Sequence, residues 1–105
     1  KQFSNYKNIK QFIITESGIG LHDVVENGLV NDAQRSNYIM SHLENILIAK
    51  NEGIPVTGFF NWTLLDNFEW AEGYHPRFGL VHVDFETQQR TIKNSALWFS
   101  KFLKD

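Results

Sequence analysis

Apolar runs alternate with polar, glycine-containing stretches along the chain. Two of these runs, residues 11–15 and 56–62, are rich in β-branched and aromatic residues and are bounded by turn residues. This pattern is typical of strands that are buried on both faces of a parallel sheet. Between them, apolar residues recur every three or four positions, which predicts an amphipathic helix from an N-cap at Asn31 or Asp32 to about Asn51. A strand, a helix and a strand in this order form a βαβ unit with parallel strands.

The remaining pattern predicts a hairpin and a second helix. Residues 79–85 alternate between apolar and polar positions, and residues 86–92 follow as the returning arm of a small hairpin. Residues 94–103 carry an apolar stripe, which predicts a terminal helix that packs on the sheet. The stripe consists of Ala96, Phe99, Phe102 and Leu103. The order of these elements indicates an α/β fold.

The composition fits one globular unit and narrows the possible partners. At 105 residues the chain holds at most one domain, and 42% apolar residues supply enough material for a core. A net charge of -2 argues against a nucleic-acid or anionic-membrane partner. No apolar run approaches the roughly 18 residues of a membrane span. The absence of cysteine excludes disulfides and thiolate metal sites and is compatible with the cytoplasmic location that we expect.

Residues 62–78 form a polar and aromatic segment with the character of a sugar-binding wall. Trp62, Trp70 and a phenylalanine offer flat faces suited to the C–H faces of a pyranose. The polar residues of the segment can hold sugar hydroxyls by charge-assisted hydrogen bonds; these are Asp66, Asn67, Glu69 and Glu72. The alternative is that the rings fill a core, which is the commoner fate of a single large aromatic. The whole segment favours a site, because α/β proteins place their sites in loops that follow strands.

A carboxylate stands at the end of the first predicted strand. Glu16 follows residues 11–15 directly, and the glycines after it allow a sharp turn. Desolvating a carboxylate at the end of a buried strand is costly, so a structural role would require an arginine partner or solvent. The functional interpretation makes Glu16 catalytic.

Two separated motifs in these segments resemble glycoside hydrolase family 1, the β-glucosidase family. The first is Ile-Ile-Thr-Glu-Ser-Gly at residues 13–18. The second is Phe-Asn-Trp-Thr-Leu-Leu-Asp-Asn-Phe-Glu-Trp at residues 60–70, followed by Gly-Tyr at 73–74 and Arg-Phe-Gly-Leu at 77–80. The resemblance covers essentially all of residues 1–105 and implies part of a catalytic domain. That part is the C-terminal quarter of a (β/α)8 TIM barrel, with its seventh and eighth βα units.

The resemblance also implies roles for individual residues. Glu16 would be the nucleophile of a retaining double displacement, and Trp62 would be a stacking platform in the glycone site. Glu69 would bind two hydroxyls of the glucose ring, including the hydroxymethyl group. Trp70 would donate its indole N–H to a ring hydroxyl, and Phe78 would close the apolar side. The implied substrates are terminal, non-reducing β-D-glucosides or oligosaccharides, and Glu69 argues against the phospho-β-glucosidase branch, which typically has Ser there.

Retaining chemistry needs a second carboxyl group, which these motifs do not supply. The family carries its acid/base Glu in an Asn-Glu-Pro motif that does not occur in this sequence, so we expect the segment alone to be inactive. Asp66, Glu72 and Asp84 are interpreted as capping or solvent-facing acids. The four histidines are far apart in sequence, so neither a metal site nor a cofactor is expected. His42 lies on the apolar face of the predicted helix and is interpreted as a core or interface residue.

Two other hypotheses stay open at this stage. A carbohydrate-binding or scaffold module could keep the aromatic wall without catalysis, although it would not require Glu16. The chain could also be a purely structural piece of a larger protein. In each case two parallel strands cannot satisfy the hydrogen bonds of their outer edges alone. We therefore expect a homo-oligomer or association with the missing N-terminal part of the barrel.

Overall fold

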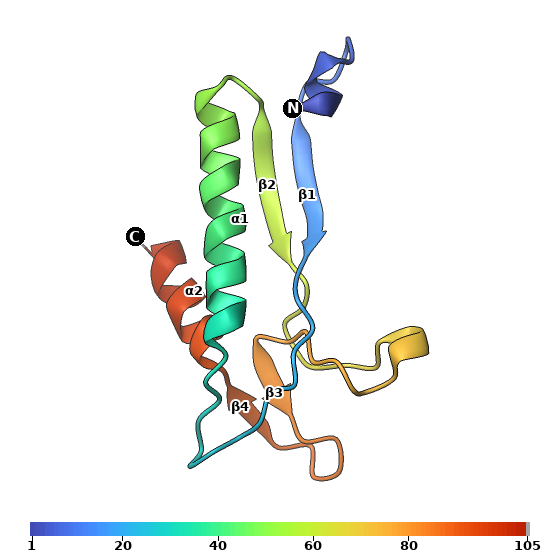
Figure 1. Ribbon diagram of the computed structural model, residues 1–105, viewed down its shortest axis with the longest axis vertical. Coiled ribbons are helices and arrows are strands. Elements are labelled where there is room, and N and C mark those ends of the chain that lie inside the picture. Colours follow the sequence, from blue (N-terminus) through green and yellow to red (C-terminus); the bar gives the residue numbers. More distant parts are fainter. Residues whose placement is uncertain (105) are drawn as a thin grey trace.

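The computed structural model describes residues 1–104 as an open, mixed α/β arrangement (Figure 1). In chain order its elements are η1 (Gln2–Asn5), β1 (Phe12–Ser17), α1 (Ala33–Asn51), β2 (Val56–Asn61), η2 (Trp70–Glu72), β3 (Val81–Val83), β4 (Arg90–Ile92) and α2 (Asn94–Lys104), where η marks a short 3-10 helix. β1 and β2 pair in parallel, and β3 and β4 pair antiparallel. The predicted βαβ unit, hairpin and terminal helix are confirmed.

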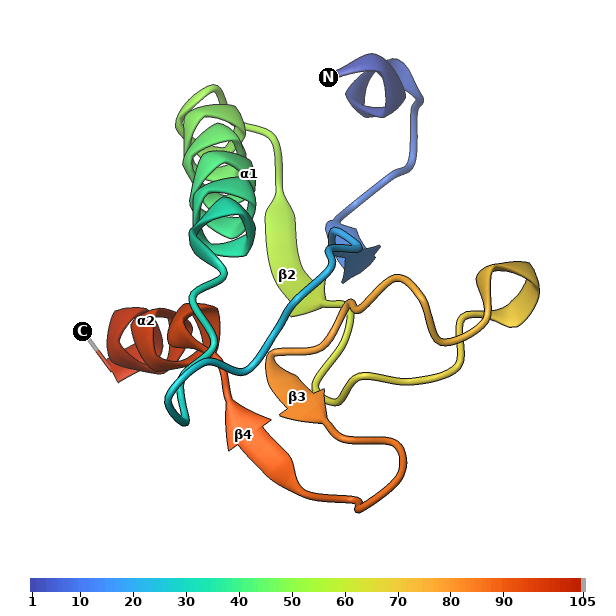
Figure 2. The same ribbon diagram turned by 60° about the horizontal axis from the view of Figure 1, so that its bottom comes forward.

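α1 runs alongside β2 in both ribbon views (Figure 1, Figure 2), and its side chains share an apolar hollow with those of β1 and β2. Ile39 of α1 is fully buried, and Phe12, Ile14 and Ile46 line an apolar hollow between this helix and the sheet. The helix ends before Gly53, whose φ of 88° is a conformation that glycine adopts without strain. Apolar packing between α1 and the sheet, together with the parallel pairing of β1 and β2, therefore holds the βαβ unit together.

α2 packs against α1, so the prediction that it packs on the sheet is wrong. The groove between the two helices is lined by Met40, Leu43 and Leu47 of α1 and by Trp98 and Phe102 of α2. The rings of Trp98 and Phe102 stack with their centroids 5.6 Å apart. The apolar spacing identified the helix, but an apolar stripe fits the apolar surface of α1 as well as it fits a sheet. Within the described residues, neither helix has the length and apolar character needed to cross a membrane.

The sheet face opposite α1 is open, which corrects the expectation that both strands are buried on both faces. Ile13 is 48% exposed and Phe60 is 61% exposed. The radius of gyration is 16.0 Å, whereas a compact chain of this length has about 13 Å. The accessible surface is 7690 Å², against about 6,100 Å² for a compact monomer of this mass. The strands have the sequence of covered strands, but the elements that would cover them are not among residues 1–104.

Candidate active site

The C-terminal ends of β1 and β2 place Glu16 beside the aromatic segment. Glu16 lies inside β1 rather than after it, and it is exposed. Between paired positions, β1 uses three steps from Ile14 to Ser17 where β2 uses two steps from Phe59 to Asn61. The extra residue interrupts the regular alternation of β1 between Ile14 and Ser17, the stretch that contains Glu16.

Backbone contacts hold Trp62 next to the end of β1. The backbone N–H of Trp62 donates to the carbonyl of Ser17 at 2.8 Å. The carbonyl oxygen of Trp62 approaches Gly18 so closely that a Cβ at residue 18 would lie 1.9 Å from it, which only glycine avoids. The start of the aromatic segment is therefore fixed one residue away from Glu16.

Trp62 and Glu69 meet through their side chains. The indole Nε1–H of Trp62 donates to Oε1 of Glu69 at 2.9 Å, and both residues are partly exposed. This bond fixes the edge of the indole against the carboxylate. A carboxylate offers about four acceptor positions, so Glu69 keeps capacity for hydroxyl donors from a sugar.

Trp70 and Phe78 have different surroundings. Trp70 lies in η2, at the outer end of the loop that the aromatic segment forms (Figure 1). It is 84% exposed, so its ring fills no core within this chain. Phe78 is half-buried, and its ring lies against Gly20, where an added Cβ would come within 2.8 Å. The structure therefore places Phe78 against the segment that follows β1, while Trp70 is open to solvent.

Asp66 is buried, which corrects its interpretation as a capping or solvent-facing acid. It is only 4% exposed. Its two side-chain oxygens accept hydrogen bonds from Arg77 Nη1 at 2.7 Å, Lys93 Nζ at 2.8 Å, Gly79 N at 2.9 Å and Val83 N at 3.3 Å. Asp66 thus accepts hydrogen bonds from the loop, from the hairpin and from the residue before α2. A short polar motif in the sequence does not reveal that these donors converge on one carboxylate.

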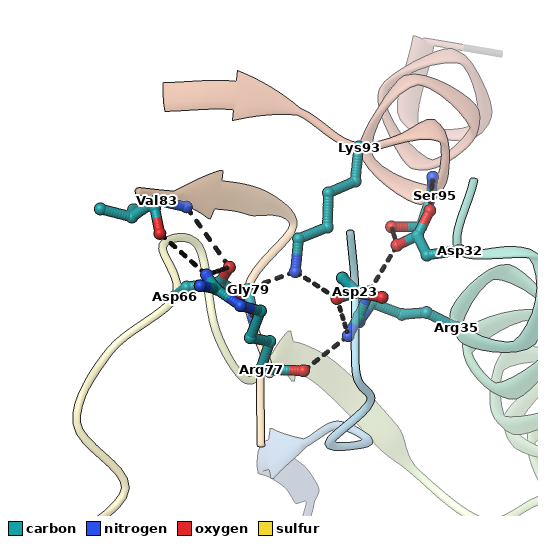
Figure 3. Close-up of polar contacts among 9 residues, drawn as sticks. All are labelled: Asp23, Asp32, Arg35, Asp66, Arg77, Gly79, Val83, Lys93 and Ser95. Atoms are coloured by element: carbon teal, nitrogen blue, oxygen red, sulfur yellow. Dashed lines mark hydrogen bonds and ion pairs between the residues drawn. The ribbon is translucent and has the colours of Figure 1, made fainter. Parts of the chain in front are cut away.

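Asp66 belongs to a buried network of three acids and three bases (Figure 3). The members are Asp23, Asp32, Asp66, Arg35, Arg77 and Lys93. Lys93 is fully buried and bridges Asp23 at 2.6 Å and Asp66 at 2.8 Å. Arg35 contacts Asp23 at 2.7 Å and also bonds Asp32. Three negative and three positive groups balance, and this pairing offsets the cost of removing them from water.

The side chain of Asp32 bonds to this network instead of capping its own helix. It occupies the N-cap position of α1, as predicted, but its side chain makes no capping hydrogen bond. Its carboxylate instead accepts the backbone N–H of Ser95 at 2.9 Å and a bond from Arg35. The start of α1 is thereby joined to the start of α2.

The charge state of Asp66 predicts how stability responds to acid. Burial alone would raise the pKa of this carboxyl, but hydrogen bonds from Lys93 and Arg77 outweigh it and hold the pKa below its ordinary value. A pKa that is lower in the folded state gives stability that is fully present above the unfolded value near 4 and is lost as pH falls through the folded value. Asp66→Asn removes this contribution, so urea unfolding followed by tryptophan fluorescence should show a deficit that is largest near pH 6 and shrinks below about pH 4. The exposed Glu72→Gln serves as the control; a deficit for Asp66→Asn that grows on acidification contradicts the assignment.

The other two acids interpreted as capping or solvent-facing are confirmed. Asp84 accepts backbone N–H bonds from Thr87 at 3.0 Å and from Glu86 at 2.9 Å, which lower its pKa. Glu72 is exposed. Asp84 therefore caps the turn that follows it, and Glu72 faces solvent.

The histidines depart from their sequence interpretation. His42 is exposed and lies against Tyr38 with ring centroids 4.0 Å apart, so of its two interpretations the core is wrong and the interface stays a prediction. His22 and His75, distant in sequence, lie edge to face at 5.7 Å. In the part of the chain that the structure describes, no three His, Cys, Asp or Glu side chains gather to hold a metal ion.

Burial and then the charge of Arg77 lower the pKa of His82, so this buried imidazole is neutral at pH 7.

Sequence reasoning missed Asp23, Arg35 and Lys93. The one local signal is the three-residue spacing of Asp32 and Arg35 at a helix start, which reads equally well as a surface pair. Lys93 and Asp23 are 70 residues apart, so no short pattern connects them. Their role follows from the fold, not from any motif.

Comparison with known proteins agrees with the two motifs. Residues 3–105 match the sequence profile of glycosyl hydrolase family 1. The chain is 48% identical over 99 residues to a 1,4-β-D-glucan glucohydrolase of Thermotoga neapolitana, covering 93% of this chain and 22% of that protein. It is 47% identical over 98 residues to a 6-phospho-β-galactosidase of Clostridium acetobutylicum, covering 93% of this chain and 21% of that protein.

The fold is also shared with solved structures. A β-glucosidase from Thermotoga maritima in complex with deoxynojirimycin superimposes with a TM-score of 0.96 and 45% identity, covering 99% of this chain and 24% of that one. The chain thus spans between a fifth and a quarter of the length of these relatives. With a profile match over nearly its whole length and close sequence relatives, the chain belongs to glycosyl hydrolase family 1.

Proposed function

We propose that this chain is the C-terminal quarter of a family 1 (β/α)8 barrel, in which β1 with α1 and β2 with α2 are the seventh and eighth βα units. The parallel β1–α1–β2 unit followed by α2 supports this placement. The open sheet face and the unpaired outer edges of its two described strands fit a sheet that continues in the rest of the barrel. The isolated chain is expected to pair with that part or with a second copy of itself.

The complete protein is proposed to be a retaining β-glucosidase that acts on terminal, non-reducing β-D-glucosides. The observation that carries this proposal is the backbone bond between Ser17 and Trp62, which brings the strand end with Glu16 and the aromatic segment to one edge of the sheet. Parallel strands present their C-terminal ends to a common site in α/β barrels. A carboxylate and a sugar-stacking surface at this edge are the parts that glycoside cleavage requires.

In the proposed mechanism Glu16 attacks the anomeric carbon and forms a glycosyl ester as the aglycone leaves. Water then hydrolyses this ester, so the configuration at the anomeric carbon is retained. A second carboxyl group, about 5 to 5.5 Å from Glu16, must protonate the leaving oxygen and later activate the water. That group is proposed to come from the remaining part of the barrel, so this segment alone is inactive.

The glycone is proposed to lie against Trp62, with Phe78 closing the apolar side. Glu69 would accept two hydroxyls, including the hydroxymethyl group, and Trp70 would donate its indole N–H to a ring hydroxyl. For Trp70 this requires that the loop around η2 folds onto the sugar, because the ring of Trp70 is open to solvent in this chain. A carboxylate at Glu69 repels a phosphate on the sugar's sixth carbon, which favours unphosphorylated glucosides over the substrate in the name of the Clostridium relative.

The test is a chimeric enzyme in which this chain replaces the matching segment of the Thermotoga maritima β-glucosidase. The chimera should hydrolyse 4-nitrophenyl β-D-glucoside and prefer it to the corresponding 6-phospho-β-D-galactoside. The Thermotoga enzyme without its matching segment is the control and should be inactive. A chimera that folds, as judged by circular dichroism, but hydrolyses neither substrate contradicts catalysis. Sugar binding without turnover would favour the carbohydrate-binding alternative.

A further inference from the structure

The carboxylate of Asp66 joins the two ends of the aromatic loop, which consists of residues 67–78. The loop leaves the sheet region at Asp66 and returns at Gly79, whose N–H donates to Asp66 Oδ1 at 2.9 Å. A Cβ on Gly79 would lie 2.3 Å from the backbone N of Asp66, so the two ends touch as closely as a backbone allows. The residues between them, 67–78, carry three of the four proposed sugar contacts. One side chain therefore closes the base of the sugar-binding loop.

Backbone bonds extend this closure into a two-stranded neck formed by residues 63–66 and 78–81. Thr63 N donates to Phe78 O at 3.1 Å, Leu80 N to Thr63 O at 2.9 Å, Val81 N to Leu64 O at 2.8 Å and Asp66 N to Val81 O at 3.0 Å. The outer loop turns on itself through Glu69 N to Gly73 O at 2.7 Å. The orientation of the outer loop toward β1 consequently depends on the neck.

Two cations, the fully buried Lys93 and the largely buried Arg77, fix the neck to the rest of the structure (Figure 3). Arg77 belongs to the loop and donates to both Asp66 Oδ2 at 2.7 Å and Val83 O at 2.8 Å. Lys93 precedes α2 and joins Asp66 to Asp23, in the segment that follows the strand of Glu16. Ion pairs that water does not reach are screened far less than surface pairs, so they hold their geometry.

We propose that Asp66 is a positioning residue for the sugar specificity of the enzyme. It sets Glu69 at the distance from Glu16 at which the carboxylate of Glu69 reaches the hydroxymethyl group of a bound glucose. This rests on the proposed function, because Glu69 is assigned that contact there. Asp66 itself touches no sugar and acts through the neck. Displacing a binding group by about 1 Å is enough to lose most of its contribution.

The test compares two buried carboxylates of the same network in the chimeric enzyme. Asp66→Asn should lower the ratio of kcat/KM for an aryl β-D-glucoside to that for an aryl β-D-xyloside, which lacks the hydroxymethyl group, by about tenfold. Asp32→Asn is the matched control, because its carboxylate is equally buried but joins α1 to α2 and makes no bond to the loop. Its ratio should stay within about twofold of the parent. A merely structural role for Asp66 predicts the same ratio for both variants.

A double-mutant cycle with Glu69→Ala separates this inference from the function on which it rests. In the Glu69→Ala background, Asp66→Asn should lower the ratio no further, because the group that it positions is gone. If Glu69→Ala lowers the ratio and Asp66→Asn does not, Asp66 is not a positioning residue. If Glu69→Ala leaves the ratio unchanged, the proposed role of Glu69 fails and the inference fails with it. Should Asp66→Asn not fold, Arg77→Gln carries the same test, since the Arg77 side chain is 18% exposed and less costly to replace.

Discussion

Glu16→Gln in the chimeric enzyme is expected to lower kcat for 4-nitrophenyl β-D-glucoside by about three orders of magnitude or more. The amide cannot displace the aglycone and form a glycosyl ester, so the first step of the double displacement is lost. The shape of the side chain is nearly unchanged, and Glu16 is exposed, so the melting temperature should stay close to that of the parent. Kinetics and thermal unfolding are measured on the same preparation.

Glu72→Gln is the matched control for this substitution. It changes an exposed carboxylate of the same chain to the same amide and should leave kcat unchanged within about twofold. Glu16→Gln that keeps more than about a few per cent of the parental rate removes Glu16 from the role of nucleophile.

Glu69→Ala is expected to lower kcat/KM for glucosides by a factor on the order of a hundred or more. This factor corresponds to a loss of about 3 kcal/mol or more in transition-state stabilisation. A carboxylate that accepts two sugar hydroxyls makes charge-assisted bonds of roughly 1.5 to 3 kcal/mol each, and both are lost. Glu69 also accepts the indole N–H of Trp62 at 2.9 Å, but both side chains are partly exposed and water can replace that bond. The melting temperature should therefore fall by only a few degrees.

The same pair of measurements can contradict the sugar wall. If Glu69→Ala unfolds the protein while the folded fraction keeps its specific activity, the carboxylate is a structural partner of Trp62. Glu72→Ala, three residues away and without such a bond, provides the comparison for a carboxylate lost from the same loop.

The local elements of this fold could be predicted because each has a pattern that its own residues determine. The spacing of apolar residues identified α1, and the short β-branched runs identified β1 and β2 with their parallel pairing. The placement of α2 could not be predicted from its stripe, because an apolar face fits α1 as well as the sheet. The burial of both sheet faces was expected from the apolar sequence of the strands, but among the described residues no element covers the face of Ile13 and Phe60.

The candidate site was proposed from residues 13–18 and 60–80, short motifs in which polar and aromatic side chains are concentrated. Trp62 and Glu69 are seven residues apart and meet through one hydrogen bond. The support of the site was not predicted, because the network around Asp66 draws on residues from 23 to 95. Asp66 looked like a surface acid because burial of a charge depends on partners that only the folded chain brings together. The irregular register of β1 between Ile14 and Ser17 likewise arises from strand pairing and has no sequence signature.

The central claim, that Glu16 is the nucleophile of a retaining glucosidase, is tested most directly by trapping the covalent intermediate. A 2-deoxy-2-fluoroglucoside with a good leaving group forms the glycosyl ester but slows its hydrolysis, because the fluorine destabilises the cationic transition state. Intact mass and peptide mapping of the chimeric enzyme should show one 2-deoxy-2-fluoroglucosyl group, carried by Glu16 and absent from Glu16→Gln. A folded, active chimera that acquires no label, or that carries it on another residue, contradicts the account.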